Sequence, residues 1–396
     1  MKITVLGDIM CEPSVLKASK AKDGSYSFDE IFAKVKPMLG ASDYVIGNLE
    51  FPLAGYEAGY SNSYYDFNAP DSFADAVKRA GIDLVSTVNN HTLDRGVDGM
   101  LRTLDVLDRA GVSHTGSFRS ADAHEDAFYF TLGETRFALV AYTYTTNKKI
   151  PEDSKYIGAI NFLRCLKSPT YLPEVAKQMK TWVDRKFPKM SPERRARIKM
   201  LVGLPNTVAR ADDYIDPETA RPFVERFRAD IVAARQKADV VIAYPHVGGQ
   251  FNLEPGAFSK WIVDEAIDAG ADAIIASHSH LIQRAEWRGI VPVTYSIGNF
   301  NMSARSTIVK KDVLPEYGIA LHLYYDGKTL QKITFSLTKN VEKKGKRAVV
   351  WPVDQLYASL TRKKDKERLI KEVKQAYRFF TTKELAENPI QQEYAF

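Results

Sequence analysis

The sequence has very few cysteines. Only Cys11 and Cys165 occur among its 396 residues. They can pair only once, so the disulfide framework that holds many small secreted domains together is excluded. This low number is compatible with a reducing compartment. A chain of this length suits one large domain with additions or two ordinary domains.

Long apolar runs are also missing. No stretch reaches the roughly 18 apolar residues of a membrane-spanning helix. The first apolar run, residues 3–6, is too short for the core of a signal peptide and is soon followed by the charged Asp8. We therefore expect a cytoplasmic protein without an intrinsic membrane segment. With 45% hydrophobic and 26% charged residues, the composition is globular, which excludes a disordered or fibrous chain.

The net charge of +6 is unevenly distributed. Residues 164–210 contain 12 Lys/Arg and 3 Asp/Glu, and residues 339–378 contain 13 Lys/Arg and 5 Asp/Glu, so the rest of the chain is acidic. Two basic segments on an acidic body could attract an anionic substrate or partner, although solvated helix faces give the same pattern. The basic runs match no nucleic-acid-binding motif, so nucleic acid is not expected as a partner.

Short apolar runs alternate with helical patterns, which indicates an α/β fold. The runs typical of buried strands are 3–6, 44–46, 84–88, 137–142, 240–244, 273–276 and 293–296. Helices are predicted at 71–80, 99–110 and 259–269, each followed by a glycine that stops it. Residues 318–325 and 332–338 flank Asp326-Gly327, which predicts a hairpin.

Two segments depart from this alternation. Residues 158–224 are predicted to be helical, and they are basic and interrupted by prolines. We interpret them as an insertion over the domain. Residues 339–396 are predicted to form a basic C-terminal extension with a helix at 363–380. The predicted organisation is therefore a main domain, 1–338, that carries the insertion, followed by the extension.

Polar residues that can bind metals or substrates follow the predicted strands one after another. They are Asp8, Asn48, Glu50, Asn90, His91, His246, His278, His280 and Asn299. In α/β sheets, ligands bind at the carboxyl ends of the strands. A single histidine at a strand end is usually structural, but several strand ends that all deliver His, Asp, Glu or Asn favour one shared site.

The side chains in this set indicate the kind of ligand. Imidazole, carboxylate and amide groups together favour a first-row divalent ion such as Mn, Fe or Zn over Ca or a thiolate site. His278 and His280 in an extended chain would place both rings on one face, because strand side chains alternate with a period of two. Both rings could then reach one metal, or one metal and its substrate.

The order of these motifs resembles the calcineurin-like metallophosphoesterases. It resembles more closely one branch, the CapA family of poly-γ-glutamate capsule biosynthesis. The hallmark Asn-Asn-His-x-x-Asp-x-Gly-x-x-Gly-x-x-x-Thr is matched by residues 89–99 and Thr103, and a later block matches within 269–300. The resemblance covers roughly 1–145 and 225–338. It implies a metallophosphatase-like layered sheet sandwich flanked by helices.

The chain departs from the patterns of these relatives at three positions. Met10 stands where phosphoesterases of this fold usually have a histidine, and Glu50 stands where they often have a bridging aspartate. Gln250 stands where CapA relatives typically have a glutamate. The losses at positions 10 and 250 favour one metal, or none, over a full two-metal site.

The resemblance implies metal-dependent hydrolysis of a phosphoester. The implied metal ligands are Asp8, Glu50, Asn90, His246, His278 and His280. His91 would donate a proton to the leaving oxygen and Asp94 would orient its ring, although Asp94 could equally be a helix N-cap or first-turn acid. His278 is also a catalytic candidate. Asn48 and Asn299 are predicted to contact the substrate.

Two alternatives remain open. The same site could move a proton at an α-carbon of a peptide or of poly-γ-glutamate, and the Met10 departure favours this epimerase chemistry. The chain could also be a non-catalytic component of capsule assembly, but several buried polar groups are costly unless they are paired or used. The expected partners are an anionic peptide, poly-γ-glutamate or a phosphorylated substrate, and proteins of capsule synthesis.

Overall fold

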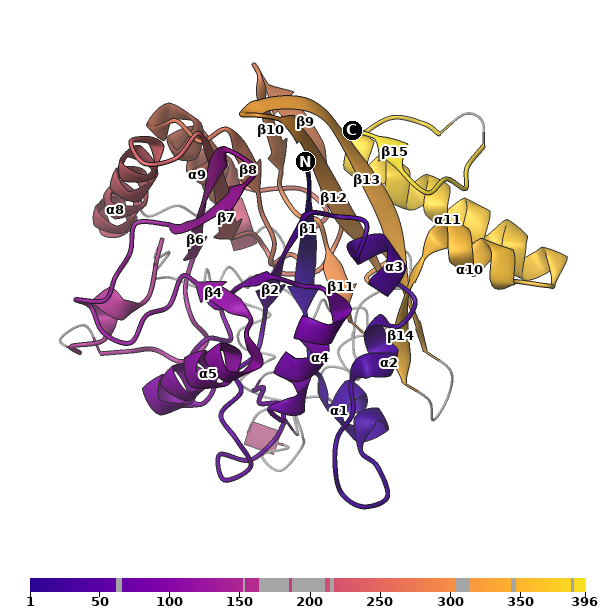
Figure 1. Ribbon diagram of the computed structural model, residues 1–396, viewed down its shortest axis with the longest axis horizontal. Helices are drawn as coiled ribbons and strands as arrows, with labels where there is room; N and C mark the ends of the chain where they lie inside the picture. The colour runs from indigo at the N-terminus through magenta and orange to yellow at the C-terminus, as the bar shows by residue number, and fades with distance from the viewer. Residues whose placement is uncertain are drawn as a thin grey trace.

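The computed structural model describes residues 1–61, 66–151, 154–163, 185–186, 211–213, 217–302, 313–342, 347–385 and 388–396. These residues form two β-sheets with helices on the outer sides (Figure 1). This is the layered α/β fold that the sequence predicts.

The first sheet is built around the N-terminal strand, in the order β14-β13-β12-β1-β2-β3-β4. Strands β1 to β4 are parallel, whereas β12 to β14 are antiparallel. Two short strands, β11 and β15, pair with β1 and β13. The bounds are β1 (Lys2–Ile9), β2 (Tyr44–Leu49), β3 (Leu84–Ser86), β4 (Ser113–Thr115), β11 (Asn299–Asn301), β12 (Tyr317–Asp326), β13 (Thr329–Glu342), β14 (Ala348–Pro352) and β15 (Tyr394–Ala395).

The second sheet has the order β5-β6-β7-β8-β10-β9. Its four inner strands are parallel and its two edge strands are antiparallel to their neighbours. The bounds are β5 (Phe128–Leu132), β6 (Thr135–Thr143), β7 (Val240–His246), β8 (Ala273–Ile275), β9 (Ala285–Arg288) and β10 (Val291–Thr294). The parallel halves of both sheets therefore have carboxyl edges where a site can form.

Helices cover the outer faces of both sheets (Figure 1). The first sheet is covered by α1 (Pro13–Ser19), α2 (Asp29–Phe32), α3 (Lys36–Leu39), α4 (Ser72–Ala80) and α5 (Gly96–Ala110). The second is covered by α8 (Pro217–Arg235) and α9 (Ala257–Ala269). The C-terminal helices are α10 (Val353–Ser359) and α11 (Lys363–Thr381), and the short 3-10 helices are η1 (Ile157–Ala159) and η2 (Ala211–Asp213).

Alternation of side chains along the strands creates these layers. In β1, Val5 belongs to the core between the sheets, whereas Leu6 packs in the cluster that includes α4 and α5. In β7, Ile242 faces the core between the sheets and Val241 packs with α8 and α9. Because successive strand residues point to opposite faces, a strand covered on both sides must be apolar throughout. This is why continuous apolar runs predict these strands.

The predicted strands, the hairpin and the three helices are all confirmed. The helix before Gly81, for example, ends there because this glycine adopts a φ of 91°, which is disfavoured for other residues. The sequence does not predict β4, β5, β9, β11, β14 or β15. These strands lie at the edges of the sheets or pair off the main strand order, so they depend on pairing with neighbours that no local sequence pattern records.

The predicted insertion, 158–224, lies mostly outside the described residues. Its described end includes the start of α8, which packs on β6 and β7. The helix predicted at 363–380 is confirmed as α11. Strand β13 crosses position 338, the predicted end of the main domain, and β14 and β15 join the same sheet. No described helix is long and apolar enough to span a membrane.

Gly7 allows β1 to approach the loop before β11. A Cβ atom at Gly7 would lie 1.9 Å from the carbonyl oxygen of Gly298, and the backbone N–H of Asp8 donates to that oxygen at 3.1 Å. We expect Gly7→Ala to lower the free energy of unfolding by about 1–3 kcal/mol or more, because the backbone at Gly298 would have to move. Urea denaturation measures this loss. Gly40→Ala, whose Cβ would lie 3.3 Å from Lys36, is the matched control; equal losses in the two variants would contradict the prediction.

Candidate metal centre and catalytic site

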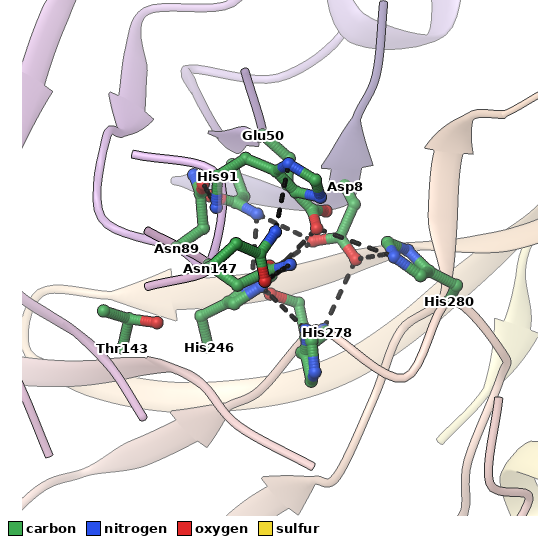
Figure 2. A network of polar contacts seen from close by, with 12 residues as sticks. Asp8, Glu50, Asn89, His91, Thr143, Asn147, His246, His278 and His280 are labelled. Atoms are coloured by element: carbon green, nitrogen blue, oxygen red, sulfur yellow. Dashed lines mark hydrogen bonds and ion pairs between the residues drawn. The ribbon is translucent and has the colours of Figure 1, made fainter. Parts of the chain in front are cut away.

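The polar residues predicted from the strand ends meet in one place (Figure 2). Asp8 lies in β1 and His246 is the last residue of β7, while Glu50 directly follows β2. His91 follows β3, and His278 follows β8. All of these side chains are buried. The carboxyl edges of both sheets thus contribute to a single polar cluster, as the sequence predicts.

Two groups of potential metal ligands share Glu50. One contains Glu50, His246 and His278, and the other contains Asp8, Glu50 and His280. Within each group, one ligand atom per residue lies within 4.8 Å of the others. Glu50 Oε1 is 3.6 Å from Nε2 of both His246 and His280. Glu50 therefore occupies the bridging position between the two groups.

Met10 contributes no ligand to either group. Its side chain is buried in the apolar cluster beneath the helices, and its backbone exchanges two hydrogen bonds of 2.8 Å with the Asn301 side chain. Gln250 is exposed. The ligand groups form without a side chain from either position, so these two departures leave the Glu50-centred cluster in place.

Glu50 has no hydrogen-bond partner for either carboxylate oxygen among the described residues. Its burial and then the nearby charge of Asp8 raise the pKa of Glu50 well above its usual value. A buried carboxylate without hydrogen bonds is costly. A cation would provide the missing interaction, so these residues fit a divalent metal.

Asp8 is held in its ionised form by its neighbours. Burial alone would raise the pKa of Asp8, but the hydrogen bond with His280 and the charges of His246 and His280 lower it below its usual value. Asn48 Nδ2 donates to Asp8 Oδ1 at 2.8 Å, and the backbone N–H of His278 donates to Oδ2 at 3.3 Å. Asp8 is therefore a preformed anionic ligand.

His246 and His278 face each other with 3.0 Å between Nε2 and Nδ1. Burial lowers the pKa of His246 to about 3. Burial, followed by the charges of His246 and His280, also lowers the pKa of His278 well below its usual value. Both rings are neutral at neutral pH, and neutral imidazole is the form that binds metals. His246 Nε2 also lies 2.8 Å from Asn90 Oδ1, which brings the predicted amide ligand to the cluster.

The prediction that His278 and His280 lie in an extended chain is wrong. Their φ angles are 109° and 57°, and they follow the end of β8 in a loop. Their ring centroids are 6.0 Å apart. The backbone is left-handed at both residues, a conformation that costs about 1–3 kcal/mol for a non-glycine residue and clusters at functional sites.

Asp94 contacts the His91 ring, as the resemblance implies. His91 Nδ1 and Asp94 Oδ2 are 2.6 Å apart, and the backbone N–H of Phe67 donates to the same oxygen at 2.7 Å. The N-cap position of α5 belongs to Arg95, which makes no side-chain capping bond. The geometry thus supports the orienting role for Asp94 over the alternative of a helix cap.

Asn48 and Asn299 lie behind the ligands and are buried. The Asn48 amide contacts both Asp8 and His246 and accepts a bond of 3.1 Å from Asn89. Asn299 Oδ1 lies 2.9 Å from His280 Nδ1, while its Nδ2 donates to two backbone carbonyls. These contacts orient the ligands, and the predicted contacts of both asparagines with a substrate stay a prediction.

Two further residues, on the segment after β6, lie beside the site. The ring centroid of Tyr144 lies 4.7 Å from that of His278, as expected for the end of the predicted strand 137–142. Asn147 is missed by the sequence analysis, and its backbone N–H donates to the Asn90 carbonyl at 2.6 Å. It belongs to no motif, and its position soon after a predicted strand was the only signal that could have identified it.

Comparisons with known proteins identify the family of the chain. Residues 2–304 match the family model described as "Bacterial capsule synthesis protein PGA_cap". The "PGA biosynthesis protein CapA" of Bacillus subtilis is 23% identical over 320 residues, which cover 80% of this chain and 67% of that protein. The "Capsule biosynthesis protein CapA" of Bacillus anthracis is 23% identical over 376 residues, covering 93% of this chain and 75% of the relative.

Two further similar proteins have no stated function. An uncharacterized protein of Sinorhizobium fredii is 27% identical over 302 residues, 72% of this chain and 64% of its own length, so the chain spans slightly less than two thirds of that relative. A hypothetical protein from Thermus thermophilus aligns over 89% of this chain and 99% of its own, with 14% identity and a TM-score of 0.39. The match over residues 2–304 shows that the chain belongs to the bacterial capsule synthesis protein PGA_cap family, within the metallophosphatase-like superfamily.

Proposed function

We propose that this chain is a CapA-like enzyme of capsule, poly-γ-glutamate or peptide metabolism that hydrolyses a phosphoester with a bound divalent metal. The observation that carries the proposal is Glu50, which is buried without a hydrogen bond among the described residues and shared by two groups of ligands. The family to which the chain belongs supports a role in capsule metabolism. The mixture of carboxylate and imidazole suits Mn, Fe or Zn.

The ligands in this proposal are those predicted from the sequence. They are Asp8, Glu50, Asn90, His246, His278 and His280. When bound, a divalent metal supplies Lewis acidity toward a phosphoryl oxygen. Because both ligand groups contain Glu50, the arrangement suits one or two ions.

His91 is the proton donor in the proposed reaction. Its Nδ1–H donates to Asp94, which fixes the tautomer and leaves Nε2 as the nitrogen that exchanges a proton with the leaving oxygen. The Phe67 ring lies 4.3 Å from the His91 ring and restricts its movement. Asp94 thus orients the His91 ring. Such general acid catalysis contributes about 10²–10⁴-fold in rate.

One observation favours epimerisation as a second function. His246 and His278 are neutral, buried imidazoles whose Nε2 and Nδ1 atoms lie 3.0 Å apart. A neutral imidazole can accept a proton from an α-carbon without a metal. An epimerase acting on poly-γ-glutamate or a peptide could therefore use the same side chains.

Removal of the metal gives a prediction about stability. In metal-free protein the pKa of Glu50 is raised by folding, so the contribution of Glu50 to stability depends on pH. This contribution is fully present below about pH 4.5, the usual pKa of the group, and is lost as the pH rises through the raised pKa. We expect Glu50→Gln to increase the melting temperature of chelator-treated protein at pH 8, because it removes a carboxylate that lacks a partner. Added Mn²⁺ or Zn²⁺ should stabilise only the wild type. A lower melting temperature for metal-free Glu50→Gln would contradict this account.

Activity gives a second prediction. Protein purified without chelator should contain metal and hydrolyse p-nitrophenyl phosphate or its diester. Glu50→Gln should lose both properties. His91→Asn should keep its metal but lose about 10²–10⁴-fold in kcat. Glu286→Gln is the matched control, because Glu286 lies outside the site and contacts Tyr295 and Arg284.

A parallel assay separates the two functions. Poly-γ-glutamate and glutamyl peptides are incubated with the protein in D₂O, with and without chelator. α-Deuterium uptake that survives chelation, without phosphoesterase activity, would replace hydrolysis by epimerisation. Metal-dependent phosphoesterase activity without deuterium uptake would support hydrolysis.

A further inference from the structure

The loop after β6 brings a side-chain amide to the catalytic cluster. Asn147 is exposed, yet its side chain points into the polar network (Figure 2). Its Oδ1 is 3.4 Å from Asn90 Nδ2, and its Nδ2 is 3.4 Å from His91 Nδ1. Asn147 is therefore next to the proposed proton donor and on the solvent side of it, where a substrate would enter.

The loop is held in a defined conformation. The Thr143 hydroxyl donates to the carbonyl of Thr145 at 2.9 Å, and the Thr146 hydroxyl donates to the carbonyl of Lys148 at 2.8 Å. The backbone N–H of Asn147 is bonded to Asn90 at 2.6 Å. These bonds fix the position of Asn147 before any substrate arrives.

Lys148 ties the same loop to the segment that carries Asp94. Its Nζ donates to the backbone carbonyl of Asp94 and lies 3.0 Å from Asp66 Oδ1. Asp66 is also paired with Arg95 at 2.5 Å. Two cations thus face one partly exposed carboxylate at this point. These contacts join the loop to the segment that carries His91 and Asp94.

The hydrogen bonds of Asn90 fix the orientation of the Asn147 amide. Asn90 Oδ1 faces His246 Nε2 at 2.8 Å, so Asn90 Nδ2 is the donor toward Asn147 Oδ1. The same assignment holds if Asn90 Oδ1 instead binds a metal. Asn147 Oδ1 is therefore the acceptor in this contact, and its Nδ2 group points toward His91.

His91 cannot accept a hydrogen bond from this amide group. Its Nδ1 carries the proton that is donated to Asp94 Oδ2, because that oxygen already accepts from the Phe67 backbone. The contact of 3.4 Å between Asn147 Nδ2 and His91 Nδ1 thus joins two donors. The amide N–H groups of Asn147 remain available to an incoming acceptor beside the His91 ring.

We propose that Asn147 Nδ2 donates a hydrogen bond to an oxygen of the substrate bound beside the His91 ring. This inference rests on the proposed function. The oxygen belongs to the phosphoryl group or to the leaving group, and it gains negative charge as the bond to phosphorus breaks. A fixed neutral donor at that point stabilises the transition state more than the ground state.

The test uses metal-loaded full-length protein and four variants. Asn147→Ala removes the amide, and Asn147→Asp keeps the acceptor toward Asn90 but replaces the donor by an anion. Asn147→Gln retains a donor on a longer side chain. Lys149→Ala is the control on the same loop, because Lys149 is exposed and lies outside the proposed contact. Metal content, kcat and KM for p-nitrophenyl phosphate, and binding of inorganic phosphate by calorimetry are measured for each.

We expect Asn147→Ala to lower kcat about 10²-fold, the usual effect of losing one such donor, with metal content unchanged and KM changed far less. Asn147→Asp should lose at least as much, Asn147→Gln should recover part of the activity, and Lys149→Ala should stay within about threefold of wild-type kcat. Full activity of Asn147→Asp, or equal losses in Lys149→Ala, would overturn the inference.

Phosphate binding separates this inference from the proposed function. If the wild type binds phosphate but has no turnover, hydrolysis is wrong, while weaker phosphate binding by Asn147→Ala would still support the donor. If the wild type is active and Asn147→Ala matches it in both turnover and phosphate binding, the inference fails and the proposed function stands.

Discussion

Two carboxylates that are buried without a lysine or arginine partner among the described residues dominate this structure. Asp8 and Glu50 are completely buried, and the ion pairs that the described residues offer them all come from histidines. Removing such charges from water costs several kcal/mol each unless the surroundings replace the lost hydration. Asp8 receives hydrogen bonds from Asn48 and from a backbone N–H, whereas Glu50 receives none. The carboxyl edges of the two sheets meet at these residues and hold Asp8 and Glu50 in place.

Asparagines carry out most of the positioning around these charges. Asn48 joins Asp8 to His246, Asn89 holds Asn48, and Asn299 holds the ring of His280. An amide can donate at one end and accept at the other, so it fixes both a carboxylate and an imidazole tautomer without adding charge. An aspartate in any of these positions would add a third negative charge to a site that already lacks compensation. The neutral shell therefore matters electrostatically as well as geometrically.

Much of the fold follows from the sequence because its central strands are covered on both sides. Their continuous apolar runs are visible without a structure, and so are the glycines that end α4, α5 and α9. Short edge strands such as β9 and β14 depend on pairing with neighbours, which no local pattern records. The metal-ligand candidates could be identified because each lies at the end of a strand or shortly after it. The left-handed backbone of His278 and His280 could not, because it is imposed by packing and not by residue type. Asn147 was missed because a lone asparagine in a polar loop has no pattern.

The two candidate chemistries share the same electrostatics and differ in the state of Glu50. Without a cation, burial and the charge of Asp8 favour the protonated, neutral form of Glu50. The cluster then holds a carboxylic acid beside neutral imidazoles, which is the equipment for proton transfer. With a cation, Glu50 is ionised and the same imidazoles become ligands. The loss of the histidine at position 10 does not choose between these states, because the ligand groups form without it. The state of the site is determined by the competition between a proton and a metal ion for the Glu50 carboxylate.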